Sequence, residues 1–207
     1  MPIHRVDRER LDALTLHHQG VVAEAAPLEY ATFEDLLARI QQHPAGAPIV
    51  LVLDSLQDPQ NFGTLLRTAA AVGVSGVVLP EHRAVGVTPA VAKVASGATE
   101  HLTIVRATNL ARALADLTSA GLWVVGLDAH GGQSLDATDL AVPLALVVGG
   151  EGKGLGRLIR EACDLVVSLP MTARTESLNA AVAGSIVLYD AFRRRAAGVE
   201  RTRPSSS

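Results

Sequence analysis

Two segments near the C-terminus combine backbone-rich turns with a few polar side chains, VVGGEGKGLG (147–156) and LPMTARTESLN (169–179). The glycine segment follows an apolar run and precedes a helical pattern, so its backbone amides are free to bind a polar group. A Walker loop would need Gly at Val147 and Ser or Thr at Gly154, and a dinucleotide fingerprint would need Gly at Leu155. The segment therefore predicts backbone recognition of another ligand, with a purely structural glycine turn as the alternative.

The second segment leaves a predicted strand at Pro170 and enters a helix near Ser177, with Thr175 or Glu176 as its expected cap and Asn179 in or beside its first turn. An adenosine needs backbone groups for its base edge and apolar side chains for its faces. The two segments offer both at Gly149, Leu169, Met171 and Leu178. Either segment alone would be interpreted as an ordinary loop with core leucines, but together they favour a nucleoside pocket.

A third polar group lies in NFGTLLRTA, where Gly63 and Arg67 are four residues apart and share one helix face that begins near Asn61. Gly63 would let a bulky group approach this face, and Arg67 would reach across it. An arginine in such an apolar helix needs a partner. The two interpretations are a salt bridge to Asp54 or Asp58, and a donor that engages a phosphate or a hydroxyl.

Short apolar runs that alternate with helical patterns must position these residues. We expect strands at 49–53, 76–80, 101–106, 122–128, 143–150 and 164–170. We expect helices at 3–15, 31–43, 61–73 capped by Asn61, 88–96, 109–121 capped by Asn109, 154–163 and 177–195, with a strand or hairpin piece at 17–30. Near-continuous Val, Leu and Ile strands predict an α/β fold, with a mostly parallel sheet covered by helices on both faces. Ligands of such sheets bind beyond the carboxyl ends of the strands, which selects the loops at 54–61, 128–132, 149–154 and 169–177.

Composition narrows the class of protein. The chain has 207 residues, a net charge of −3 and one cysteine, Cys163, which we expect to be a buried small hydrophobe rather than a metal ligand. No apolar run reaches the ~18–20 residues of a membrane span, and the N-terminus lacks the apolar core of a signal peptide, so we expect a cytoplasmic protein. The net charge gives no global basic field for nucleic acid. Local basic clusters occur at Arg5, Arg8 and Arg10, at His82 and Arg83, and at Arg193 to Arg195, where a solvated surface is the simplest interpretation.

The three segments N61-F-G-T-L-L-R67-T-A, V148-G-G-E-G-K-G-L155 and L169-P-M to S177-L-N179 occur in one order along the chain. Together they resemble the three signature motifs of the SpoU/TrmH family of RNA 2′-O-ribose methyltransferases, over roughly residues 49–195. The joining text, including VVGLDAHG and ESLNAAVAGSIVLYDAFRRR, is most similar to the bacterial RlmB branch, which modifies a guanosine of 23S ribosomal RNA.

The resemblance implies a SPOUT-type fold whose C-terminal part forms a trefoil knot, and S-adenosyl-L-methionine as the methyl donor, with no metal. By position, the cofactor-binding residues would be Gly149, Leu169, Leu178, Leu127, Gly150 and Met171. The catalytic and orienting residues would be Arg67, Asn61, Glu151, Ser177 and Asn179. Members are homodimers in which the motif containing Asn61 and Arg67 faces the cofactor site of the partner subunit.

The implied chemistry is direct displacement of a methyl group by a ribose oxygen, which needs alignment rather than a metal. Family accounts often make the arginine a general base, but a guanidinium has a pKa above ~12 and stays protonated in proteins. We therefore expect Arg67 to stabilise the developing alkoxide and to hold the neighbouring phosphate.

Two departures from the family pattern bear on the target. Ala181 stands where a serine is usual, and it fits tight helix packing. Only HRVDRERLDALTLHHQGVVAEAAP resembles the end of the RNA-binding domain that RlmB-like proteins carry. We expect residues 1–47 to be a shortened remnant of that domain plus a linker helix, 48–196 the methyltransferase domain, and 197–207 a disordered tail.

Structured RNA is the expected partner, with ribosomal RNA favoured over tRNA. A tRNA 2′-O-methyltransferase and a ribosomal RNA resistance methyltransferase of the same family are the alternatives among enzymes. A catalytically silent RNA-binding protein with this fold is disfavoured because Asn61, Arg67, Glu151 and Asn179 occur together. A doubly wound nucleotide-binding enzyme is disfavoured by the failed fingerprints of the glycine segment.

Overall fold

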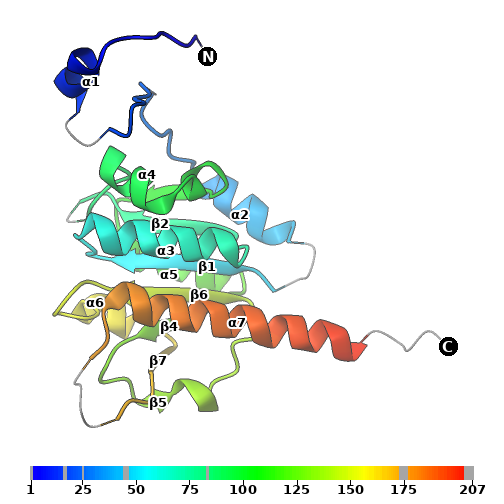
Figure 1. The fold of residues 1–207 in the computed structure, drawn as a ribbon. Helices are drawn as coiled ribbons and strands as arrows, with labels where there is room; N and C mark the ends of the chain where they lie inside the picture. Colours follow the sequence, from blue (N-terminus) through cyan, green and yellow to red (C-terminus); the bar gives the residue numbers. More distant parts are fainter. Residues whose placement is uncertain are drawn as a thin grey trace.

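One parallel sheet organises the computed structural model, which describes residues 2–15, 18–24, 26–43, 47–82, 84–172 and 177–202, the last six by backbone alone. Within these ranges the sheet has seven strands in the order β3-β2-β1-β6-β4-β7-β5, and every described pair is parallel (Figure 1). The strands are β1 Ile49–Asp54, β2 Gly76–Pro80, β3 Ile104–Ala107, β4 Trp123–Leu127, β5 Gln133–Ser134, β6 Leu144–Gly149 and β7 Leu165–Ser168. The α/β fold with a parallel sheet is therefore confirmed, while the trefoil knot stays a prediction.

Both faces of the sheet are buried, which explains why its central strands are apolar throughout. Leu51 and Leu53 of β1 pack into one core with α3 Pro59–Ala71, α4 Pro89–Ala95 and α7 Ala180–Thr202. Val50 and Val52 point to the opposite face. There they pack with α2 Phe33–Gln41, α5 Leu110–Ser119 and α6 Arg157–Glu161. Figure 1 shows α3 and α7 side by side in front of the sheet and α5 behind it.

The helix α3 starts earlier than predicted because Asp58 and Pro59 begin it. The Asp58 side chain accepts a hydrogen bond from the Gln60 amide at 2.9 Å, and Pro59 occupies the first turn, where its missing N–H costs nothing. Asn61 is therefore not the cap, and its side chain is free for other contacts. The added Cβ of a residue at Gly63 would lie 2.5 Å from Val94 Cβ, so the group that approaches this glycine is α4 rather than a ligand.

The other helix ends follow local sequence signals to different degrees. Asn109 caps α5, as predicted, by accepting from the Arg112 amide at 3.0 Å. The helix α6 is shorter than the predicted 154–163, because the preceding glycines form a turn instead. The helix α7 begins at Ala180 and runs to Thr202, so residues 197–202 are helical and the predicted disordered tail is wrong there. Residues 203–207, Arg83, and the expected caps Thr175 and Glu176 lie outside the described residues.

The beginning of the chain, residues 2–14, contributes nothing to the buried core of the sheet. The helix α1 Arg8–Leu14 has no buried residue, and it stands apart from the sheet in Figure 1. The strand or hairpin predicted at 17–30 is wrong for the described residues 18–24 and 26–30, which form neither strand nor bridge, and Ala31 directly after them forms an isolated bridge to Val105. None of the helices in the described ranges has the length and apolarity that a membrane crossing requires.

Candidate active site

A cavity of about 1010 Å³ opens at the carboxyl ends of β4, β6 and β7. Its lining includes every residue predicted to bind the cofactor, namely Leu127, Gly149, Gly150, Leu169, Met171 and Leu178. It also includes Glu151, Ser177 and Asn179 of the predicted catalytic group. The carboxyl edge of the parallel sheet, where ligands of such sheets bind, therefore brings the glycine segment and the segment 169–179 to one cavity.

The glycine segment forms a tight turn that leaves room for a ligand. The Gly154 amide donates to the Gly150 carbonyl at 3.1 Å, and Gly152 and Gly154 have φ angles of +75° and +61°. A Cβ at Gly149 would overlap the Gly154 backbone, and a Cβ at Gly150 would lie 2.6 Å from the Ser55 carbonyl oxygen. These glycines are thus required by the turn itself, and the same turn presents its backbone to the cavity.

Three side chains from the three motifs form one hydrogen-bonded network beside the cavity. Asn61 Nδ2 donates to Glu151 Oε1 at 2.7 Å, and Asn179 Nδ2 donates to Asn61 Oδ1 at 2.8 Å. Asn61 is 7% exposed, so both its amide oxygen and its amide nitrogen need the partners that they have. Asn179 in turn caps α7 by accepting from the Ala181 amide at 2.9 Å. The network therefore fixes the start of α7 against the glycine loop.

Glu151 is held as an anion by this network. Burial alone would raise the pKa of its carboxyl group, but hydrogen bonds from the Asn61 side chain and from backbone amides, including that of Gln57, outweigh burial and lower the pKa. A carboxylate with a lowered pKa is a weak base near neutral pH. Glu151 is therefore suited to orient Asn61 rather than to remove a proton.

Arg67 lies apart from the network. It is exposed on α3, it does not line the cavity, and no described residue forms an ion pair or hydrogen bond with it. The predicted alternative of a salt bridge is wrong, because Asp54 accepts from the Gly156 amide at 2.7 Å and Asp58 caps α3. The guanidinium is thus available to a group from outside this chain.

Ala181, which stands where the family usually has a serine, is 1% exposed in the core between α7 and the sheet, in agreement with tight helix packing.

The single cysteine makes a structural contact. The Sγ of Cys163 donates to the Ile159 carbonyl at 3.2 Å, and burial raises the pKa of this thiol to about 12. In the part of the chain that the structure describes, no three His, Cys, Asp or Glu residues gather as metal ligands would.

Asp128, His130 and Lys153 also line the cavity. They lie in the loops 128–132 and 149–154 that the strand ends selected, although none of the three was named as a site residue.

Comparison with known proteins identifies the family of the chain. The sequence model of the SpoU rRNA Methylase family matches residues 48–189. The chain belongs to this family. The model for RNA 2′-O ribose methyltransferase substrate binding matches residues 1–31, ahead of this SpoU domain.

Individual relatives are similar to this chain in sequence and in fold. The chain is 47% identical over 194 residues to the putative TrmH family tRNA/rRNA methyltransferase YacO of Bacillus subtilis, covering 93% of this chain and 78% of YacO. Its fold is similar to that of the SpoU methyltransferase AviRb from Streptomyces viridochromogenes, with a TM-score of 0.71 and 30% identity over 79% of this chain. The complex of AviRb with the cofactor AdoMet gives a TM-score of 0.69 and 31% identity over 78% of this chain. The chain spans 65% and 62% of the two AviRb chains.

Proposed function

We propose that this chain transfers a methyl group from S-adenosylmethionine to the ribose 2′-hydroxyl of a nucleotide in structured RNA. The observation that carries the proposal is the contact between the Glu151–Asn61–Asn179 network and the cavity of the glycine loop. Membership of the SpoU family supports methyl transfer, and the AdoMet complex of AviRb supports the choice of donor.

Backbone groups and apolar side chains would hold the donor. The turn at Gly149 and Gly150 offers amides and carbonyls for the adenine edge, and Leu127, Leu169 and Leu178 offer apolar surface for its faces. Leu178 lines the cavity and is 40% exposed, so it offers apolar surface that a ligand can cover. The donor supplies a methyl group on a positively charged sulfur, which makes the methyl carbon open to attack.

The reacting ribose oxygen would form a bond to the methyl carbon while the bond from that carbon to sulfur breaks and the sulfur becomes neutral, and the hydroxyl proton would pass to solvent water. Asn61, Glu151 and Asn179 would fix the loop that positions the donor, with Ser177 beside them at the cavity. Arg67 stays charged and would stabilise the developing alkoxide and hold the neighbouring phosphate.

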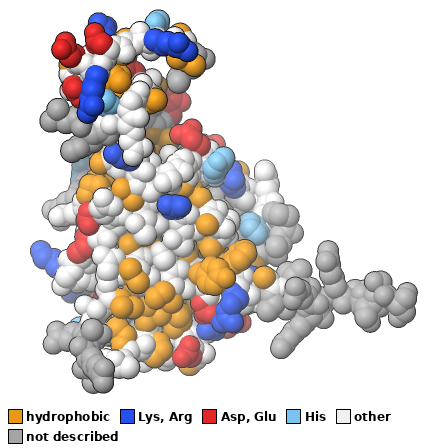
Figure 2. All heavy atoms as spheres, in the orientation of Figure 1, with side chains coloured by type: hydrophobic (Ala, Val, Ile, Leu, Met, Phe, Trp, Pro, Cys, Tyr) orange, Lys and Arg blue, Asp and Glu red, His pale blue; other side chains and the backbone are white. Residues whose placement is uncertain are grey.

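A homodimer would bring Arg67 to a second copy of the site. Hydrophobic side chains gather over α7 in Figure 2, and those that are 40–58% exposed on this helix and just before it are Leu178, Val182, Ile186, Tyr189 and Phe192. All of them except Phe192 line a groove of about 820 Å³ that is also lined by Thr64 and Thr68 of α3. Arg67 lies beside these threonines in the sequence, so a partner seated in the groove would meet the unpaired guanidinium.

The dimer is tested by light scattering of the Ile186→Asp variant. A charge in the middle of the apolar surface should convert a dimer into a monomer, while Ala196→Asp, farther along the same helix, should leave the mass unchanged. A wild-type mass equal to one chain would refute the proposed dimer.

Ribosomal RNA, with a guanosine of 23S rRNA as the target, is the proposed substrate, and tRNA is the second candidate. The resemblance to the RlmB branch and the description of the SpoU rRNA Methylase family support the first, while the name of YacO covers both RNAs. The substrate-binding match at residues 1–31 supports contact with RNA of either kind. Under this proposal residues 1–47 contact RNA, 48–196 transfer the methyl group, and the protein acts in the cytoplasm where its substrate lies.

Labelled methyl transfer to separate tRNA and ribosomal RNA pools tests the reaction and the substrate together. The expected product is a dinucleotide that resists alkali, because a 2′-O-methyl group blocks cleavage at that linkage. Label on a base would refute ribose methylation. Calorimetric titration with S-adenosylmethionine and with NAD checks the class of enzyme, since binding of NAD alone would contradict a methyltransferase.

A further inference from the structure

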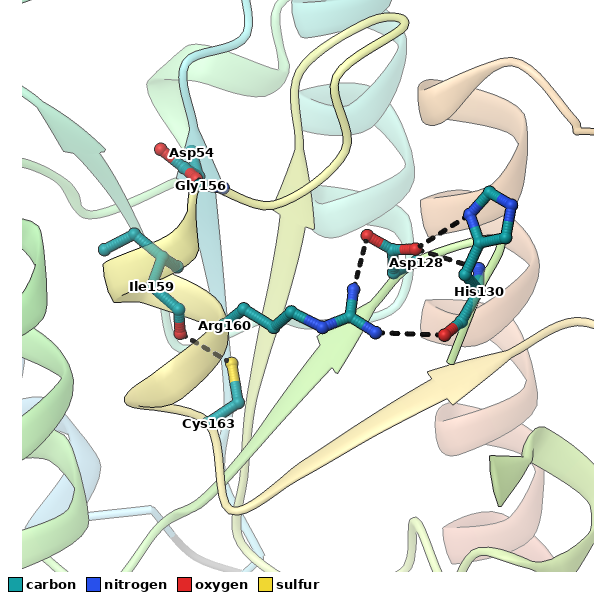
Figure 3. Close-up of polar contacts among 7 residues, drawn as sticks. All are labelled: Asp54, Asp128, His130, Gly156, Ile159, Arg160 and Cys163. Carbon is teal, nitrogen blue, oxygen red and sulfur yellow. Dashed lines mark hydrogen bonds and ion pairs between the residues drawn. The ribbon is translucent and has the colours of Figure 1, made fainter. Parts of the chain in front are cut away.

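The residues that directly follow β4 form one wall of the cavity, and an arginine from α6 holds them in place. Arg160 Nη1 lies 3.0 Å from Asp128 Oδ2, and Arg160 Nη2 donates to the His130 carbonyl oxygen at 2.9 Å (Figure 3). One planar guanidinium therefore holds both a side chain and the backbone of the same short stretch. Asp128 and His130 line the cavity, whereas Arg160 of α6 is not among its lining residues.

The Asp128 carboxylate also reaches the opposite wall. It accepts from the His130 amide at 2.8 Å, and it lies against the end of the glycine loop. A Cβ at Gly154 would lie 2.6 Å from Asp128 Oδ2, so the carboxylate rests directly on that glycine. The Asp128 side chain thus connects the stretch after β4 to the loop that closes the other side of the cavity.

This carboxylate is a structural anion rather than a free ligand. Burial alone would raise its pKa, but the His130 amide, the charge of Arg160 and the Leu155 amide outweigh burial and lower the pKa. Its side chain is 10% exposed, and its oxygens already accept from Arg160 and from the His130 amide. Little acceptor capacity remains for a bound molecule.

We propose that Asp128 and Arg160 are positioning residues that set the width of the methyl-donor cavity by holding its two walls together. The inference rests on the proposed function, because the cavity is taken as the donor site. A preformed cavity avoids the cost of ordering loops when the donor binds. Loss of the pair should therefore weaken donor binding about tenfold, the size expected for losing one charge-assisted hydrogen bond, and change kcat at saturating donor much less.

The test measures the dissociation constant of S-adenosylmethionine for the full chain by calorimetry. Asp128→Asn and Arg160→Met should each bind about tenfold more weakly, and Arg160→Lys, which keeps the charge but not the fork, should fall between them and the wild type. The matched control is Arg157→Gln on the same helix, since Arg157 pairs with Glu161 at 2.9 Å on the surface and does not line the cavity. This control should bind like the wild type.

The double variant Asp128→Asn with Arg160→Met decides whether the two residues act as a unit. Binding no weaker than that of either single variant supports the proposal, whereas additive losses overturn it. A loss with Asp128→Asn but none with Arg160→Met would also overturn it, because Asp128 would then contact the donor directly. Hydrogen exchange at the His130 amide, which donates to Asp128, gives a readout without donor, and it should quicken in Arg160→Lys.

Failure of this inference differs from failure of the proposed function. If the wild-type chain does not bind S-adenosylmethionine, the proposed function falls and this inference with it. If the wild type binds and all variants bind within twofold of it, only the positioning role of Asp128 and Arg160 is refuted.

Discussion

Replacing Asn61 with Asp tests the network at its centre with almost no change in shape. The substitution removes the amide that donates to Glu151 Oε1 at 2.7 Å and places a second carboxyl group there. Asn61 is 7% exposed, so the new carboxylate would lie beside another one with little water between them. Either one carboxyl group takes up a proton or the contact between the glycine loop and α3 breaks.

The expected loss of folding stability can be estimated from the contacts of Asn61. A hydrogen bond to a charged group contributes about 1.5–3 kcal/mol, and the accompanying repulsion is screened because Glu151 itself is exposed. We expect the free energy of unfolding at pH 7 to fall by about 2 kcal/mol. The matched control is Gln60→Glu, which makes the same chemical change at an exposed neighbour and should change stability by less than about 0.5 kcal/mol.

The loss should also depend on pH in a defined direction. In the wild type the pKa of Glu151 is lowered on folding, so its contribution to stability is present above the unfolded pKa and is lost as the pH falls through the folded value. In Asn61→Asp the carboxyl pair binds a proton more tightly when folded, so its cost is present at neutral pH and shrinks on acidification. The difference in the free energy of unfolding between the wild type and Asn61→Asp should therefore become smaller from pH 7 to about pH 4.

Urea unfolding followed by circular dichroism at a series of pH values measures both quantities. Equal stability of Asn61→Asp and Gln60→Glu at pH 7 would refute the network as a stabilising contact. A difference that stays constant with pH would show that ionisation of Glu151 has no part in it.

Other predictions address the turn, the arginine and the thiol. Gly149→Ala should weaken S-adenosylmethionine binding more than about tenfold, because its Cβ would overlap the Gly154 backbone, whereas Gly132→Ala, with open space around it, should bind normally in the same titration. Arg67→Lys should lower methyl transfer about 10–100-fold without changing the melting temperature, since Arg67 has no partner among the described residues, and near-full activity would contradict bidentate positioning. Cys163 should resist alkylation by iodoacetamide at pH 8 in the folded protein, because its pKa is raised to about 12, and modification as fast as in urea would argue against its burial.

The sequence by itself determined the central strands, most of the helices and the three motifs. Strands β1, β2 and β6 follow from unbroken apolar runs, since residues buried on both faces leave no polar alternation. The cap Asn109 and the glycine after its helix fix α5, because both act through neighbouring backbone groups. The site residues were found through their resemblance to a family pattern rather than through periodicity.

Only the tertiary structure decided which of these residues meet. The insertion of β6 between β1 and β4 brings Glu151 to Asn61, 90 positions away in the chain, and the placement of α7 beside α3 brings Asn179 to it. The contact of α4 with Gly63 and the pairing of Arg160 with Asp128 arise in the same way. The physical reason is that periodicity reports which face of an element is buried, whereas the partner on that face depends on strand order and helix packing across the whole chain.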